Sequence, residues 1–100
     1  MKIYISGGIT GVQDYMVKFA EVEEFLTAEG YEVINPAKVN ANLPASTRYE
    51  EYMKMCMVMI DMCEAVFLID GWEESRGARF EKMYADIMGK VILDGWKWLK

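Results

Sequence analysis

One glutamate is out of place on a helix that the sequence predicts over residues 76–88. Three other charged side chains of this helix fall on one side and mark its water-facing surface: Arg79, Lys82 and Asp86. At 3.6 residues per turn, Glu81 points about 130° away from the centre of that surface. It shares its stripe with Ala78, Ala85 and Met88. Such a carboxylate is either a functional group at a ligand site or a half-buried glutamate bonded to tyrosine or backbone.

The turn that leads into this helix contains a second set of candidate groups. Ser75 supplies a hydroxyl, and the segment through Gly77 and Ala78 supplies successive backbone amides, a combination that can hold an anion. Ser75 is also an ordinary N-cap residue, and both roles are compatible. Trp72 either stacks on a base or covers the core. Burial would raise the pKa of the nearby Glu81, whereas the helix dipole and arginine would lower it.

A glycine-rich loop, Ser6-Gly7-Gly8-Ile9-Thr10-Gly11, follows the first predicted strand. Its glycines let the backbone approach a ligand closely, and its N–H groups can face a phosphate. It is not a dinucleotide-binding fingerprint, because Ser6 stands where the first glycine belongs and the second strand ends in Asn35-Pro36 rather than in an acid. The alternative interpretation is a turn that only links a strand to a helix.

These groups need a scaffold, and the hydrophobic pattern indicates a parallel α/β sheet. Strands are predicted over residues 2–6, 31–35, 65–69 and 91–93. Helices are predicted over residues 14–29, 48–63 and 76–88, with a loop at 37–46. We therefore expect one domain over residues 1–100, a flavodoxin-like or Rossmann-like three-layer sandwich whose mainly parallel sheet has four or five strands. The fifth would be an antiparallel edge strand at Trp96-Lys97-Trp98.

The carboxyl ends of such strands are where α/β proteins bind ligands, and the loops at 7–11, 35–46 and 70–77 meet there, so Asn35 is also a candidate substrate-binding residue. Thr47 and Glu50 suggest a capping box for the second helix. Between Tyr52 and Cys63 this helix is almost entirely apolar, so we expect it to be buried, in part between subunits of a homodimer or larger homo-oligomer.

Composition narrows the function classes. The chain has 11 basic and 16 acidic residues and a net charge of −5, which argues against binding a nucleic acid polymer. It has no histidine, so neither a metal site nor a Ser-His triad is expected, and no cofactor is predicted. No apolar run is long enough to span a membrane. Cys56 and Cys63 lie about 10 Å apart along one helix, too far for a disulfide, which favours the cytoplasm.

The motifs resemble those of the nucleoside 2-deoxyribosyltransferase-like superfamily, most closely its short, often phage-associated members of unassigned function. The resemblance covers most of the chain. It rests on residues 4–11, Asn35-Pro36-Ala37, Cys63-Glu64-Ala65 and Gly71-Trp72-Glu73-x-Ser75-x-Gly77-Ala78-x-x-Glu81. The 2′-deoxynucleoside 5′-monophosphate N-glycosidases of this superfamily have the same Ser-to-Glu spacing of six.

The resemblance implies that Glu81 attacks C1′ of a deoxyribonucleoside and that the glycosyl group then passes to another base or to water. It also implies that Ser75 binds a 5′-phosphate and that the loop from Gly7 to Gly11 borders sugar and base. The chain departs from the pattern in three places. Cys56 stands where relatives carry an acid, Gly7-Gly8 replaces Gly-Pro, and Thr10 replaces an arginine.

The sequence therefore leaves three functions open. The first is an enzyme that transfers or cleaves the N-glycosidic bond of a deoxynucleoside or its 5′-monophosphate. The second is a non-catalytic protein that binds a nucleotide or nucleotide-derived signal in the same pocket. The third is an interaction module that uses a Met-rich helix. The Ser75–Glu81 motif favours the first, and Cys56 favours the second.

Overall fold

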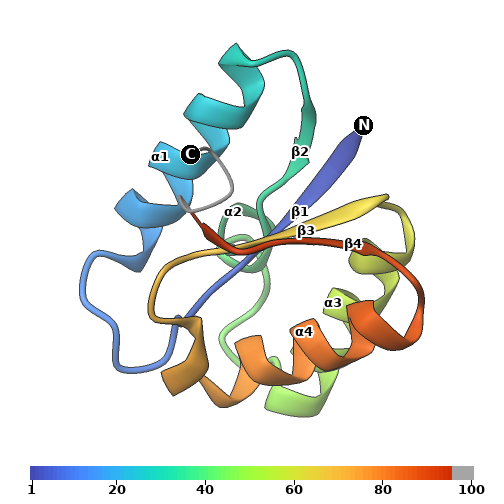
Figure 1. Ribbon diagram of the computed structural model, residues 1–100. Coiled ribbons are helices and arrows are strands. Elements are labelled where there is room, and N and C mark those ends of the chain that lie inside the picture. Colours follow the sequence, from blue (N-terminus) through green and yellow to red (C-terminus); the bar gives the residue numbers. More distant parts are fainter. Residues whose placement is uncertain (96–100) are drawn as a thin grey trace.

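The computed structural model describes residues 1–95 and has a four-stranded, fully parallel sheet at its centre (Figure 1). Its strands are β1 (Lys2–Ser6), β2 (Glu32–Ile34), β3 (Ala65–Leu68) and β4 (Val91–Leu93). Their order is β2-β1-β3-β4, so β1 and β3 occupy the centre. All four residues of β3 are buried, as a central parallel strand requires. The predicted antiparallel strand at residues 96–98 lies outside the described residues.

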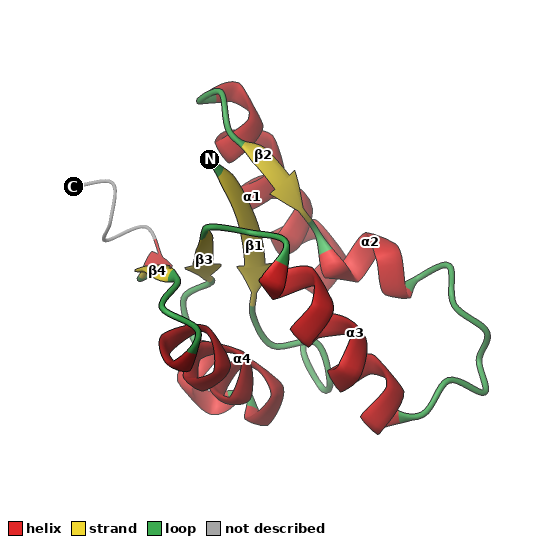
Figure 2. Cartoon of the chain, turned by 90° about the vertical axis from the view of Figure 1, so that its right-hand side faces the viewer, coloured by secondary structure: helices red, strands yellow, loops and turns green. Residues whose placement is uncertain are grey.

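Helices cover both faces of the sheet and produce the predicted three layers (Figures 1 and 2). On one face, α1 (Tyr15–Ala28) packs Phe19, Val22 and Leu26 against Ile3 and Ile5 of β1. On the other face lie α3 (Tyr49–Asp61) and α4 (Arg76–Ile87). Successive side chains of a strand point to opposite faces, so Tyr4 and Ser6 of β1 point to the side of α3 and α4. This alternation positions the site described below.

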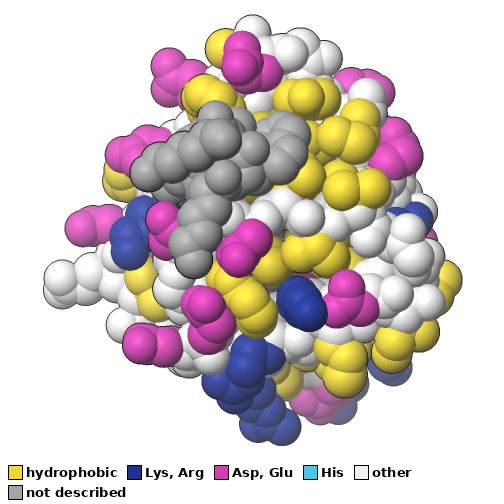
Figure 3. All heavy atoms as spheres, in the orientation of Figure 1, with side chains coloured by type: hydrophobic (Ala, Val, Ile, Leu, Met, Phe, Trp, Pro, Cys, Tyr) yellow, Lys and Arg dark blue, Asp and Glu magenta, His cyan; other side chains and the backbone are white. Residues whose placement is uncertain are grey.

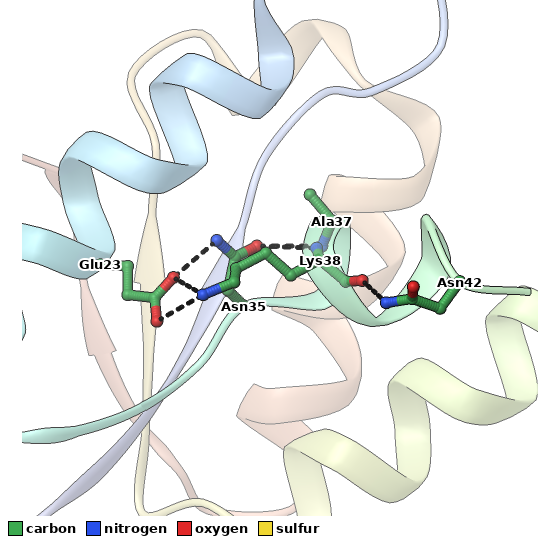
Figure 4. Close-up of polar contacts among 5 residues, drawn as sticks. All are labelled: Glu23, Asn35, Ala37, Lys38 and Asn42. Carbon is green, nitrogen blue, oxygen red and sulfur yellow. Dashed lines mark hydrogen bonds and ion pairs between the residues drawn. The ribbon is translucent and has the colours of Figure 1, made fainter.

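The predicted loop at 35–46 is wrong in its first part, because residues 36–40 form the short helix α2 (Pro36–Asn40). Asn35 begins it as N-cap. Its Oδ1 accepts hydrogen bonds from the amides of Ala37 (3.0 Å) and Lys38 (3.3 Å), and its amide group donates to Glu23 of α1 at 3.0 Å (Figure 4). Pro36 fits the first helical position because its missing N–H would have no partner there. Between α3 and α4, Trp72–Glu74 form one 3-10 turn, η1.

The predicted capping box at the start of α3 is displaced by one residue. The side chain of Glu51, not Glu50, accepts a hydrogen bond from the backbone N–H of Arg48 at 2.8 Å. Thr47 instead donates its hydroxyl to the carbonyl of Pro44 at 2.7 Å, which closes the preceding turn. Helix α3 still begins next to two acidic residues, Glu50 and Glu51, whose negative charges stabilise the N-terminal end of a helix.

Helix α3 is less buried within the chain than its composition predicts. It buries Cys56, Met59 and Ile60, whereas Val58 is 60% exposed. On α4, Ile87 is 73% exposed. Hydrophobic side chains also reach the surface at several places on the face seen in Figure 3, among scattered acidic groups. Within residues 1–95, no helix combines the length and the apolar character that crossing a bilayer requires.

Candidate active site

A cavity of about 660 Å³ opens at the carboxyl ends of the two central strands. The chain leaves β1 toward β2 on one side, whereas β3 lies on the other side of β1. The connections that leave the ends of β1 and β3 therefore diverge, and such a switch point is where open α/β sheets hold ligands. Side chains from β1, the β1–α1 loop, all four α-helices and the turn before α4 line this switch-point cavity.

Glu81 projects from α4 into the wall of the switch-point cavity and is held by two short hydrogen bonds. The hydroxyl of Tyr4 donates to one carboxylate oxygen and that of Ser6 to the other, both at 2.6 Å. Both donors come from β1, because alternate residues of that strand face α4. The polar stripe predicted for α4 lies elsewhere, where Lys82 and Asp86 form an ion pair at 2.7 Å.

Burial and hydrogen bonding act on Glu81 in opposite directions. Removal from water disfavours the charged form and raises the pKa of Glu81, while the donors Ser6, Tyr4 and Cys56 lower it, and burial dominates. Burial and the adjacent carboxylate of Glu81 raise the pKa of Tyr4 well above its ordinary value, so Tyr4 remains a donor. The arrangement is an oriented, poorly hydrated carboxylate with two fixed donors.

Cys56 stands next to this carboxylate. It lines the switch-point cavity from α3, and its thiol also donates to the carbonyl of Met53 at 3.0 Å. Burial, followed by the charge of Glu81, raises the pKa of Cys56 far above its ordinary value, so the thiol stays neutral. Cys63 packs on the same face of the sheet, and both cysteines are free, as their spacing predicts.

Ser75 takes its predicted place as the N-cap of α4, where its Oγ accepts a hydrogen bond from the amide of Ala78 at 3.1 Å. Its hydroxyl proton is still available to a ligand. Ser75, Gly77 and Ala78 all line the switch-point cavity. Gly8 of the β1–α1 loop lies close by, since a Cβ built on it would come within 3.4 Å of the Ser75 Cβ. The loop and the helix start therefore form one continuous wall.

The glycine-rich loop divides its residues between two hollows. Gly7 and Thr10 line the switch-point cavity, whereas Gly8, Thr10 and Gly11 line a second hollow of about 340 Å³ on the other side of Ser75. A Cβ at Gly7 would lie 3.0 Å from the side chain of Ile69, so a larger residue there would require Ile69 to move. Gly11 has a φ of +74°, which favours glycine.

Two predicted site residues lie elsewhere. Asn35 is buried beneath α2, where its side chain serves as the cap described above, and it is not among the residues that line either hollow. Trp72 packs beside the core under α3 and α4, and its indole N–H donates to Asp94 at 3.3 Å. Trp72 therefore packs against the core, and it is not among the residues that line either hollow.

Sequence reasoning missed the aromatic lining of the switch-point cavity. Tyr15, Tyr49 and Tyr52 line it together with Tyr4, and the guanidinium of Arg76 lies 5.8 Å from the centre of the Tyr49 ring. Strand alternation could have paired Tyr4 with Ser6, but no local pattern brings residues near 50 to α4. Residues 1–95 hold no group of three side chains fit to bind a metal ion.

Fold and site together define a parallel α/β protein with a carboxylate-centred ligand cavity at its switch point. The chain belongs to the family described as Domain of unknown function (DUF4406), whose model matches residues 1–94. A search among curated proteins gave no match. The matched region contains every residue of the site.

Proposed function

We propose that this protein cleaves or transfers the N-glycosidic bond of a deoxynucleoside or its 5′-monophosphate, with Glu81 as nucleophile. One observation carries the proposal: Glu81 faces a 660 Å³ cavity while Tyr4 and Ser6 fix both of its oxygens. A cavity of that volume matches small-molecule sites. The resemblance to the nucleoside 2-deoxyribosyltransferase-like superfamily supports the same role for Glu81.

In the first step, a carboxylate oxygen of Glu81 bonds to C1′ while the bond from C1′ to the base nitrogen breaks. Tyr4 and Ser6 hold the carboxylate so that it meets C1′ without rotating. In the second step, water or another base attacks C1′, and the electron pair of the sugar–Glu81 bond returns to the carboxylate. Two inversions retain the configuration at C1′.

A 5′-phosphate fits the start of α4. Ser75 offers its hydroxyl proton there, and the positive end of the helix dipole favours an anion. Arg76 adds a full positive charge and is the only Lys or Arg among the described lining residues of the switch-point cavity. This arrangement would place the sugar between the phosphate at the first turn of α4 and the carboxylate of Glu81.

The test is incubation with a panel of deoxynucleosides and their 5′-monophosphates, followed by chromatography for free base. Glu81→Gln keeps the shape of the side chain and removes the nucleophile. We expect the wild-type protein to release base and Glu81→Gln to release almost none. Equal release by the two proteins would refute a glycosyl-enzyme mechanism.

A second candidate function is nucleotide binding without catalysis. Cys56 favours it, because a neutral thiol stands beside Glu81 where the resemblance implies an acid. In that case calorimetry would detect nucleotide binding by a wild-type protein that releases no base. Glu81→Gln would then change affinity alone.

A further inference from the structure

Breaking an N-glycosidic bond leaves an electron pair on the base. A neutral base is a poor leaving group unless a proton reaches it, and a positioned acid contributes about 10²–10⁴-fold to the rate. The side chains around the switch-point cavity therefore limit which bases can leave, provided that the proposed function holds.

Among the described residues that line the switch-point cavity, none is a histidine, and no carboxyl group other than that of Glu81 is removed from solvent. The chain lacks histidine. Cys56 keeps its proton, because burial and Glu81 raise its pKa, and the hydroxyl of Tyr4 is committed to Glu81. Among the described lining residues the only carboxyl groups are Glu81 and Glu74, and Glu74 is exposed on η1 where the two hollows meet. Glu74 thus lies at the exposed rim of the switch-point cavity.

The same walls suit a positive charge. Phe19 and three tyrosines, Tyr15, Tyr49 and Tyr52, contribute aromatic surface to the cavity. Aromatic faces attract cations, and Tyr49 already holds the guanidinium of Arg76 at 5.8 Å. Among the described lining residues, two have acidic side chains, Glu81 and Glu74, and one has a basic side chain, Arg76.

We propose that the preferred substrates are 2′-deoxyribosyl N-glycosides whose base already carries a positive charge, such as N-deoxyribosyl pyridinium compounds or N7-alkylated purine deoxynucleotides. This inference rests on the proposed function and specifies its substrate class. The observations behind it are the aromatic, net acidic lining formed by the described residues and the neutral Cys56 thiol beside Glu81.

The reaction then balances without an acid. A Glu81 oxygen bonds to C1′, the bond from C1′ to the ring nitrogen breaks, and its electron pair cancels the positive charge of the ring. The base leaves neutral and needs no proton. Water then attacks C1′, the electron pair of the sugar–oxygen bond returns to Glu81, and the extra proton of the water passes to solvent.

The experiment compares two substrates that differ by one methyl group, 2′-deoxyguanosine 5′-monophosphate and its N7-methyl derivative. Each kcat/KM is divided by the spontaneous rate of base loss under the same conditions. We expect the wild type to accelerate loss of the methylated base at least as strongly as loss of the neutral one, and its uncorrected kcat/KM to be at least 100-fold higher. An enzyme with a fitted acid accelerates the neutral substrate more strongly, and that result would overturn the inference.

Cys56→Asp tests the cause. A carboxyl at this position should raise the ratio of kcat/KM for the neutral substrate to kcat/KM for the methylated one by about 10²-fold. Cys56→Ser is the matched control and should keep the wild-type preference. A gain for both substrates alike would contradict the inference. If circular dichroism shows that Cys56→Asp does not fold, the comparison of the two substrates with the wild-type protein tests the inference by itself.

Two further outcomes separate the inference from the function on which it rests. A loss of neutral-base release in Glu74→Gln would identify Glu74 as the missing acid and overturn the inference while the glycosidase function stands. If the wild type releases base from neither substrate at any enzyme concentration, the proposed function itself fails, and the inference fails with it.

Discussion

Replacing Glu81 with glutamine should stabilise the protein at neutral pH. The amide keeps the shape of the carboxylate, and because hydroxyls both donate and accept, Tyr4 or Ser6 can turn to accept from the new NH₂ group. Two hydrogen bonds to a charged acceptor, roughly 1.5–3 kcal/mol each, become neutral bonds of about 0.5–1.5 kcal/mol each. The desolvation cost of a buried carboxylate, several kcal/mol, disappears at the same time.

The direction of the Glu81 pKa shift determines whether Glu81→Gln is more or less stable than the wild type at neutral pH. Burial outweighs the hydrogen bonds to Glu81, so its pKa in the folded protein is raised above the unfolded value. The group therefore contributes most to stability below the unfolded carboxyl pKa, and that contribution is lost as pH rises through the folded pKa. We expect the free energy of unfolding of Glu81→Gln to exceed that of the wild type by about 1–2 kcal/mol at pH 7, which is roughly 4–16 °C in Tm for a domain of this size. Near pH 4 the difference should vanish.

Urea unfolding followed by circular dichroism between pH 4 and pH 8 measures this difference. Glu24→Gln, at an exposed position on α1, is the matched control. Its free energy of unfolding should differ from that of the wild type by less than about 0.5 kcal/mol at every pH. If Glu81→Gln is destabilised by more than 1 kcal/mol at pH 7, the hydrogen bonds outweigh burial. Glu81 is then a structural carboxylate, and the reasoning is refuted.

Three further predictions concern the site and the surface. Tyr4→Phe removes one hydrogen-bond donor from Glu81 and should raise the Glu81 pKa further. The fall in rate on the acid side of the pH–rate profile should therefore occur at higher pH than in the wild type. An unchanged profile on the acid side would contradict the pKa argument. Ser75→Asp keeps the helix cap but repels phosphate. In calorimetry, the ratio of the affinity for a 5′-monophosphate to that for its nucleoside should fall at least tenfold in this variant. Ser75→Thr should keep the wild-type ratio. The protein should form a homodimer through the apolar surfaces of α3 and α4, and Ile87→Lys should yield monomers in light scattering; a wild-type monomer at high micromolar concentration excludes this.

Much of the scaffold could be predicted from the sequence because its elements have strong local signals. The alternating strand from Lys2 to Ser6 and the apolar strand at 65–68 are recognisable from composition alone. Helix α2 was not predicted because its five residues are too few to show a helical period, although Asn35 followed by Pro36 is a signal for the start of a helix. The capping box was predicted one residue too early because Glu50 and Glu51 both suit it, and only the fold determines that Glu51 bonds to the Arg48 amide.

The site was predictable in part, for a different reason. Glu81 and Ser75 were recognisable because each interrupts or begins the pattern of its own helix. Tyr4 and Tyr49 were missed because their proximity to α4 depends on which strands pair and which face each helix covers. Those contacts depend on tertiary packing, which cannot be read from the hydrophobic periodicity of a single helix or strand.

The two hydrogen bonds to Glu81 also have a consequence for ligand discovery. They join residues separated by 77 and 75 positions, so the first strand and α4 must both be in place before the carboxylate is held. A molecule bound there would resist opening of the whole domain rather than of one segment. By mass action, a ligand present at 100 times its Kd would add about 2.7 kcal/mol to global stability. Thermal denaturation in the presence of a chemical library would therefore report occupancy of the cavity without any assay of turnover.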